Sequence, residues 1–132
     1  MSRKSKGCNA ERELVHMFRE ASWAPLRVAG SGSARMPCPD IIAGNGIRRI
    51  AIEAKSTKNT SVYIPIEEVR ELERFALMFG SEAWLAVRFN NNPWWFLRPV
   101  DAKVTENNYV ISLQTAKLSG SSFEQLIQNI YK

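Results

Sequence analysis

Residues 39–55 read PDIIAGNGIRRIAIEAK and constrain the fold more than any other stretch of the chain. Two apolar arms, residues 40–43 and 48–55, flank the sequence GNG, and Asn-Gly between two such runs is a strong signal for a β-hairpin. The arms also carry Asp40, Glu53 and Lys55, which are costly to bury without partners. The stretch therefore predicts a β-hairpin in which the side chains of Asp40, Glu53 and Lys55 have a function.

The spacing of the three charged residues suggests how they are arranged. Side chains alternate between the two faces of a strand. If Asn45-Gly46 is the two-residue turn, Asp40 lies opposite Ala51 and Glu53 is its diagonal neighbour on the same face, roughly 7–8 Å away. Lys55 then lies one step further along that face. A turn longer by one residue would put the acids on opposite faces, so this prediction depends on the turn.

Two carboxylates at this separation can share one divalent metal ion, and carboxylate oxygens suit Mg²⁺ or Mn²⁺. Such an ion stabilises charge on a phosphate group and activates bound water. A lysine beside it can position the attacking water or neutralise the transition state. The alternative is an ordinary half-exposed strand that carries a Glu–Lys pair.

The first helix and the loop after it add further candidates. Glu11 shares a helix side with Leu14, Val15 and Phe18, so it could be a third acid for a metal site. It could equally be a first-turn acid that favours the helix dipole, an explanation that applies to Glu13 just as well. The remaining candidates are arginines that could bind phosphates and loop serines that could bind a phosphate or a metal-bound water: Arg12, Arg27, Arg35, Ser31 and Ser33.

The charge distribution points to a polyanionic partner. Net charge is +5, and residues 1–60 contain eleven Lys and Arg but only five Asp and Glu, whereas residues 61–132 contain seven and eight. A basic half of this kind favours nucleic acid, with a charge that serves only solubility as the alternative. No apolar run is long enough for a membrane span, and no signal peptide or disulfide framework is recognisable. We expect a cytoplasmic protein with no membrane partner.

The remaining pattern predicts the elements. Asn9 caps a helix over residues 10–21, residues 23–28 form a strand, and residues 30–39 form a loop. A second helix begins at Pro65 and ends at Gly80, strands follow over residues 83–89, 94–100 and 109–113, and a capping box at Ser122 and Gln125 begins a last helix. This order predicts an α/β fold, with a central mixed β-sheet flanked by helices. We expect a single domain over residues 1–132, with residues 1–8 as a flexible basic arm.

Several motifs together resemble a known family. Pro39-Asp40 followed by Glu53-Ala54-Lys55 resembles the PD-(D/E)XK nuclease superfamily, which has a restriction-endonuclease-like nuclease core. The upstream motifs narrow the resemblance to the archaeal Holliday-junction resolvase family, strongly over residues 3–58 and loosely beyond: Arg3-Lys4, Ala10-Glu11-Arg12-Glu13-Leu14, Arg27, Gly-Ser-Gly-Ser, Pro39-Asp40-Ile41-Ile42-Ala43 and Ile52-Glu53-Ala54-Lys55-Ser56.

The resemblance implies an endodeoxyribonuclease that cuts four-way DNA junctions as a symmetric homodimer and uses Mg²⁺, for which Mn²⁺ can substitute. It implies that Asp40 and Glu53 are metal ligands, that Lys55 is the catalytic lysine, and that Glu11 rather than Glu13 is a further catalytic acid and metal ligand. Ser31 would be the catalytic loop serine, with Ser33 as the less favoured alternative. The residues expected to contact DNA are Arg3, Lys4, Lys6, Arg12, Arg27, Arg35 and Lys58.

A homodimer also has a physical reason, because two matched nicks require two identical sites related by a two-fold axis. The candidates for the subunit interface are the aromatic strand and the last helix, with Phe123, Leu126, Ile127 and Ile130. Two alternatives stay open: a restriction- or repair-type endonuclease of the same superfamily, and a non-catalytic DNA-binding protein.

Overall fold

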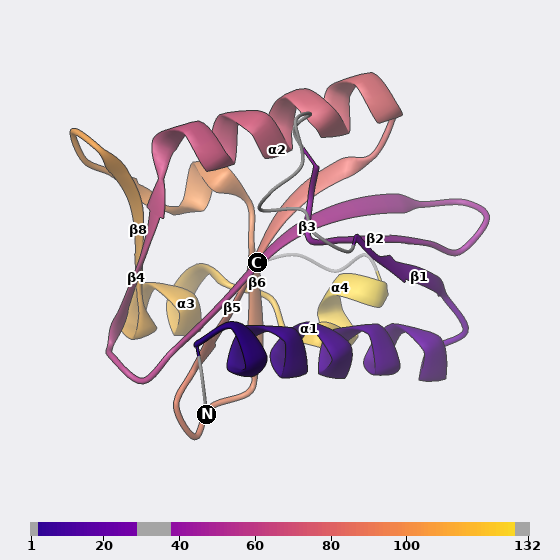
Figure 1. The fold of residues 1–132 in the computed structure, drawn as a ribbon, viewed down its shortest axis with the longest axis horizontal. Coiled ribbons are helices and arrows are strands. Elements are labelled where there is room, and N and C mark those ends of the chain that lie inside the picture. The colour runs from indigo at the N-terminus through magenta and orange to yellow at the C-terminus, as the bar shows by residue number, and fades with distance from the viewer. Residues whose placement is uncertain (1–2, 29–37, 129–132) are drawn as a thin grey trace. The chain divides into compact units, whose positions relative to one another are not determined.

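A computed structural model describes residues 3–28 and 38–128 of the chain (Figure 1), with side chains from residue 9 onward. Its helices are α1 (Arg3–Glu20), α2 (Ile66–Phe79), α3 (Leu113–Ser119), α4 (Phe123–Ile127) and the 3-10 turn η2 (Pro99–Asp101). Its strands are β1 (Ala24–Arg27), β2 (Ile41–Gly44), β3 (Arg49–Thr57), β4 (Ser61–Pro65), β5 (Glu82–Phe89), β6 (Trp94–Leu97), β7 (Lys103–Val104) and β8 (Asn108–Ser112). None of these helices is long and apolar enough to cross a membrane.

The strands form two sheets. The larger has the order β1-β2-β3-β5-β6, and the smaller has the order β4-β8-β7. The predicted class, an α/β fold with a central mixed sheet flanked by helices, is confirmed. Strand β3 has neighbours on both sides, and Ile50, Ala51 and Ile52 are fully buried. Burial of both faces explains why this strand is so apolar.

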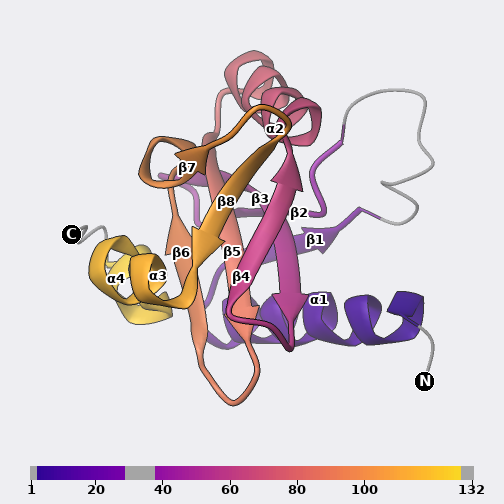
Figure 2. The same ribbon diagram turned by 90° about the vertical axis from the view of Figure 1, so that its left-hand side faces the viewer.

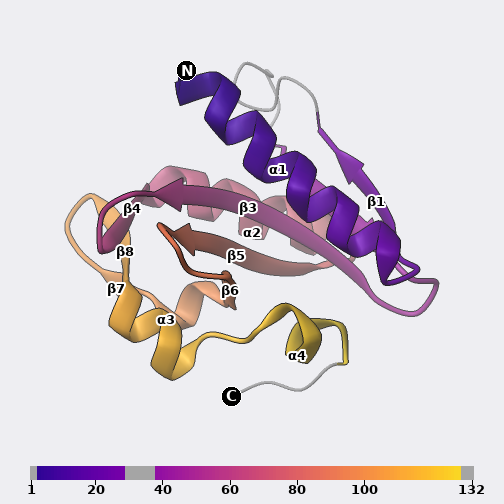
Figure 3. The ribbon, with the colours of Figure 1, turned by 90° about the horizontal axis from the view of Figure 1, so that it is seen from below.

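The chain divides into two compact units, and β3, α2 and β5 each run through a boundary between them. The first unit comprises residues 1–54 and 71–83. In it α1 lies alongside β1 (Figure 3), and the helix contributes Leu14 and Phe18, both fully buried. The ring of Phe18 contacts that of Trp23, with 5.6 Å between centroids. The prediction of one domain over residues 1–132 stays a prediction.

The second unit comprises residues 55–70 and 84–132. Its small antiparallel sheet places β8 between β4 and β7 (Figure 2). Val62, Ile64 and Ile111 fill the buried face of this sheet, while Tyr63 is exposed on the other. The predicted capping box is confirmed, since Ser122 and Gln125 each bond the other's backbone N–H at the start of α4.

The sequence pattern misplaced some element ends. Helix α1 begins at Arg3, not after a cap at Asn9, because Lys and Arg are good helix formers and one asparagine does not stop a helix. Pro65 is the last residue of β4 and not part of the second helix, which begins at Ile66. Strand β7 and helix α3 were not predicted, because each is short and gains its stability from the small sheet and from tertiary packing. Strand β4 was not predicted because Pro65 was assigned to the start of the second helix.

The turn of the central hairpin also differs from the prediction. The Asn45 side chain accepts hydrogen bonds from the N–H groups of Ile47 and Arg48, and the Asn45 N–H donates to the Arg48 carbonyl. Gly46 and Ile47 are therefore the central turn residues, and Gly46 has φ +95°. An asparagine that bonds backbone two and three residues ahead favours this turn. As a result Ala51 pairs with Ile42, not with Asp40.

Candidate active site

Asp40 is fixed beside strand β3 by three hydrogen bonds. Its N–H donates to the Ile52 carbonyl at 2.9 Å, and its carbonyl accepts from the Val28 N–H at 2.9 Å. Its Oδ2 accepts from the Ala54 N–H, also at 2.9 Å. The predicted position opposite Ala51 is thus wrong: the two β3 residues that Asp40 reaches are Ile52 and Ala54. Glu53 lies between these two residues on β3, so Asp40 lies next to Glu53 and not at the diagonal position that the sequence predicted.

Glu53 and Lys55 lie two positions apart on β3, so alternation along the strand puts them on one face. Both are half-buried, which distinguishes them from the fully buried residues that precede them on the strand. The Nζ atom of Lys55 lies 3.1 Å from Oε2 of Glu68, a residue in the first turn of α2. Sequence reasoning missed Glu68, because it looked like any first-turn acid next to Glu67.

Glu11 forms a close ion pair. The Nε atom of Arg27 donates a hydrogen bond of 2.8 Å to Oε1 of Glu11, which joins β1 to α1. Glu13, the alternative acid, is exposed on the same helix. The structure therefore separates two acids that sequence alone treated alike: Glu11 is held in a defined place by an arginine that was itself predicted as functional.

For the other predicted site residues the structure gives only the position in the fold or the exposure, and some lie outside the described residues. Arg12 is exposed on α1, and Lys58 is exposed in the turn between β3 and β4. Ser31, Ser33 and Arg35 lie outside the described residues. Arg3, Lys4 and Lys6 belong to the first turns of α1, and their side chains lie outside the description too. Contacts of these residues with DNA stay predictions.

By ligand type, Asp40 and Glu53 are suited to hold a divalent metal ion as a pair. In the described part of the chain no three His, Cys, Asp or Glu side chains form a group that could hold a metal, and the role of Glu11 as a third metal ligand stays a prediction. Two carboxylates are nevertheless a common protein contribution to a Mg²⁺ site, where waters and substrate phosphates complete the coordination. The donor set is compatible with Mg²⁺ or Mn²⁺, and Asp40 is already oriented by the Ala54 N–H.

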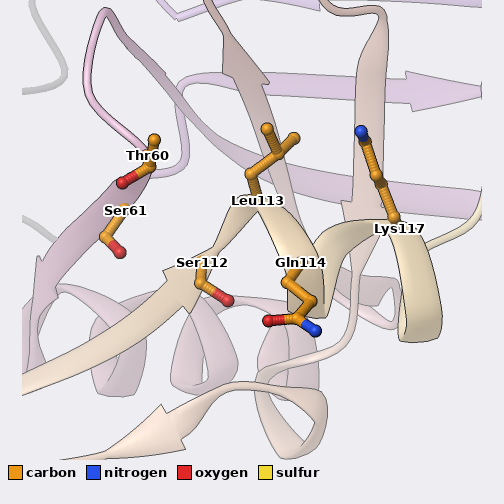
Figure 4. A pocket seen from close by; sticks show the side chains of 6 residues that line it. All are labelled: Thr60, Ser61, Ser112, Leu113, Gln114 and Lys117. Atoms are coloured by element: carbon orange, nitrogen blue, oxygen red, sulfur yellow. The ribbon is translucent and has the colours of Figure 1, made fainter.

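A separate hollow of about 410 Å³ lies in the second unit, at the junction of β4, β8 and α3 (Figure 4). Its lining residues are Thr60, Ser61, Ser112, Leu113, Gln114 and Lys117. They include a single cation and no acid, and Ser112 also serves as the cap of α3 by accepting from the Thr115 N–H. This hollow therefore lacks the ligands that metal-assisted hydrolysis needs.

The predicted subunit interface stays a prediction, although most of its candidate side chains are buried within their own chain. Phe123 and Leu126 of α4 are buried, as are Trp94, Phe96 and Leu97 of β6, so these side chains belong to the core of their own chain. Ile127 is half-buried, and Ile130 lies outside the described residues. An amphipathic pattern does not distinguish a face that packs inside the chain from one that packs on a partner. At the end of α2, by contrast, Leu77 and Met78 are strongly exposed.

Comparison with known proteins shows to which family the chain belongs. The family model for the archaeal Holliday junction resolvase (Hjc) matches residues 2–132. The chain belongs to this family. The crossover junction endodeoxyribonuclease Hjc of Archaeoglobus fulgidus is 39% identical over 130 residues, covering 92% of this chain and 95% of the relative. The Hjc of Sulfolobus acidocaldarius is 38% identical over 133 residues, covering 98% and 92%.

A solved structure agrees with this placement. The 1.6 Å structure of Archaeoglobus fulgidus Hjc, described as a Holliday junction resolvase, matches with a TM-score of 0.86 and 36% sequence identity, and covers 92% of this chain and 98% of that chain. Membership of the Hjc family confirms the predicted family and the predicted enzyme class, an endonuclease. A nuclease of this family also implies a divalent metal cofactor.

Proposed function

We propose that this chain resolves four-way DNA junctions by paired symmetric nicks and uses Mg²⁺, with Mn²⁺ as a substitute. The observation that carries the proposal is that three hydrogen bonds fix Asp40 in place. Two of them join it to Ile52 and Ala54, the residues on either side of Glu53 in strand β3. A carboxylate that is held in place before any ligand arrives needs no reorganisation during the reaction.

In this proposal Asp40 and Glu53 would hold the metal ion, which would supply charge neutralisation at the scissile phosphate and activation of the attacking water. Lys55 follows Glu53 on the same face of β3, and its ammonium donates hydrogen bonds to the attacking water or to the phosphate oxygens as negative charge develops. Glu11 contributes a further carboxylate, and its position is set by the hydrogen bond from Arg27. Ser31, or Ser33 in its place, adds a hydroxyl to the site.

We propose that affinity for the junction comes mainly from its phosphates and its shape, because none of the described elements has the form of a base-reading motif. Arg12 and Lys58 are exposed and suited to phosphate contacts. The same role is proposed for Arg3, Lys4, Lys6 and Arg35, and in part for Arg27. Binding of this kind releases counterions, so affinity should fall steeply as salt concentration rises.

We propose further that the active form is a homodimer, because two symmetric nicks require two copies of one site. The surface best suited to a second copy is the end of α2, where Leu77, Met78 and Phe79 are consecutive exposed apolar residues. The ring of Phe79 stacks on that of Phe75 with 5.2 Å between centroids, which gives the surface a rigid apolar part. Exposed apolar clusters of this kind often mark subunit interfaces.

The decisive experiment compares the wild type with Asp40→Asn on a labelled four-way junction, with and without Mg²⁺. Asparagine keeps an oxygen that can accept from the Ala54 N–H but removes the negative charge, so the fold should be preserved. We expect normal junction binding and no cutting. Full cutting by this variant would contradict the proposed site, and equal cutting of linear duplex and junction by the wild type would contradict the proposed substrate.

A further inference from the structure

One described ion pair involves the proposed catalytic lysine. Lys55 Nζ lies 3.1 Å from Glu68 Oε2, and the two side chains are 33% and 40% exposed. Ion pairs between side chains that are each about a third exposed contribute little to stability, because ordering two long side chains costs entropy. A stabilising role therefore explains poorly why this pair exists.

Several features hold the Glu68 side of the pair in place. Strand β4 leads directly into α2, and the Ile66 N–H at the start of the helix donates to the Asn107 carbonyl at 3.1 Å. Ile64 and Val69 on either side of this junction are fully buried. The first turn of α2 is thus anchored, and a carboxylate is favoured there because it lies near the positive end of the helix dipole.

The oxygen that faces the lysine is also shielded from water. Oε2 of Glu68 is inaccessible to solvent and accepts no hydrogen bond from a described residue, so its contact with Lys55 is an ion pair by proximity, although the side chain as a whole is partly exposed. Since water cannot reach this oxygen, the Lys55 ammonium supplies the charge that compensates it. Glu67, the preceding residue in the same helical turn, is exposed. The two neighbouring glutamates therefore differ in environment, and Glu68 alone of the two is directed at the lysine.

We propose that Glu68 is a positioning residue for phosphodiester cleavage: it holds the Lys55 ammonium at the place where the reaction uses it. This inference rests on the proposed function, in which Lys55 acts at the scissile phosphate. Lysine is a point charge on a flexible four-carbon stem, so an unpaired ammonium would sample many rotamers. An anchored ammonium acts from one place, and small errors in such placement slow catalysis severely.

The test compares Glu68→Gln and Glu68→Ser with Glu67→Gln as the matched control. Single-turnover cutting of a pre-bound four-way junction is measured with Mg²⁺, together with junction affinity without divalent ions and the melting temperature. We expect both Glu68 variants to cut roughly 10- to 100-fold more slowly, the scale of a misplaced catalytic group. Affinity and melting temperature should stay near wild type, and the Glu67 variant should cut normally.

A second readout needs neither DNA nor metal. In protein labelled with ¹⁵N-lysine, the Lys55 ammonium resonance should be observable in the wild type and in Glu67→Gln, because pairing slows proton exchange and rotation, and should broaden in both Glu68 variants. Lys55→Arg assigns the signal. A Glu68 variant that cuts at the wild-type rate or faster, or that keeps the sharp resonance, overturns the inference. A wild type that does not cut junctions overturns the proposed function instead, and the ammonium resonance still reports whether Glu68 orders the lysine.

Discussion

The Nε atom of Arg27 donates a hydrogen bond of 2.8 Å to Oε1 of Glu11, with both side chains mostly buried. The pair connects an arginine expected to contact DNA with an acid expected to take part in catalysis. A guanidinium that is committed to a carboxylate contributes less to non-specific phosphate binding than a solvent-exposed one. Arg27 should therefore act chiefly through Glu11.

Replacing Arg27 by alanine should slow junction cutting by at least about tenfold, because a partly buried hydrogen bond between charged groups is worth roughly 1.5–3 kcal/mol and its loss removes one of the contacts that hold Glu11. The salt dependence of junction affinity should change little. Single-turnover rates and a salt titration of the dissociation constant check both points. Normal cutting combined with a smaller salt slope would show that Arg27 is a plain phosphate contact.

Arg12→Ala should behave in the opposite way, because Arg12 is exposed on α1. Loss of one phosphate contact should lower the slope of log affinity against log salt by about one, while cutting of a saturated junction stays normal. Arg19→Ala, an exposed arginine near the end of the same helix, is the control and should leave the slope unchanged. Equal slopes for Arg12→Ala and the wild type would exclude Arg12 from the DNA contact.

Glu53→Gln and Asp40→Asn should each weaken binding of Mn²⁺ in the absence of DNA by at least about tenfold, because each removes one charged oxygen ligand from the proposed metal site. Electron paramagnetic resonance of free Mn²⁺ measures this directly. Glu106→Gln, which changes an exposed acid in the turn between β7 and β8, should bind Mn²⁺ like the wild type. If either site variant bound Mn²⁺ normally, its carboxylate would not be a ligand.

Leu77→Glu should shift the protein from dimer to monomer, because the charge would be placed on an apolar surface that a second copy is proposed to cover. Light scattering coupled to gel filtration gives the mass. Leu118→Glu is matched to it, since Leu118 of α3 is also strongly exposed but lies outside that surface. A Leu77→Glu protein that remains dimeric would place the interface elsewhere.

Gly46→Ala should lower the free energy of unfolding by about 1–2 kcal/mol, the cost of a left-handed backbone conformation for a residue with a Cβ atom. A Cβ atom there would meet no neighbour within 4 Å, so strain alone is tested. Gly44→Ala is the control, since its Cβ atom would make only ordinary contacts with Arg48 and Arg49. Urea unfolding compares the two, and equal stability would mean that the turn adapts freely.

Local patterns predicted much of the fold. The sequence correctly indicated the hairpin around residues 45–48, the strands β1, β5, β6 and β8, and the capped start of α4. These could be predicted because alternation, turn residues and caps depend on neighbouring residues. Strand β4 had a signal too, with Val62 and Ile64 buried and Tyr63 exposed. It was missed because Pro65 was read as the start of a helix rather than the end of a strand.

The sequence by itself predicted a site from the spacing of Asp40, Glu53 and Lys55, and it led to the family that comparison confirmed. Only the tertiary structure decided how these residues are held. The hydrogen bonds of Asn45 place the turn one position later than predicted, so Asp40 lies next to residues 52–54. The hydrogen bond from Arg27 distinguishes Glu11 from Glu13. Glu68, which belongs to helix α2, forms an ion pair with Lys55 of strand β3. The last two relationships join residues that are distant in sequence, and the physical reason is that partners are chosen by packing, which no local pattern encodes.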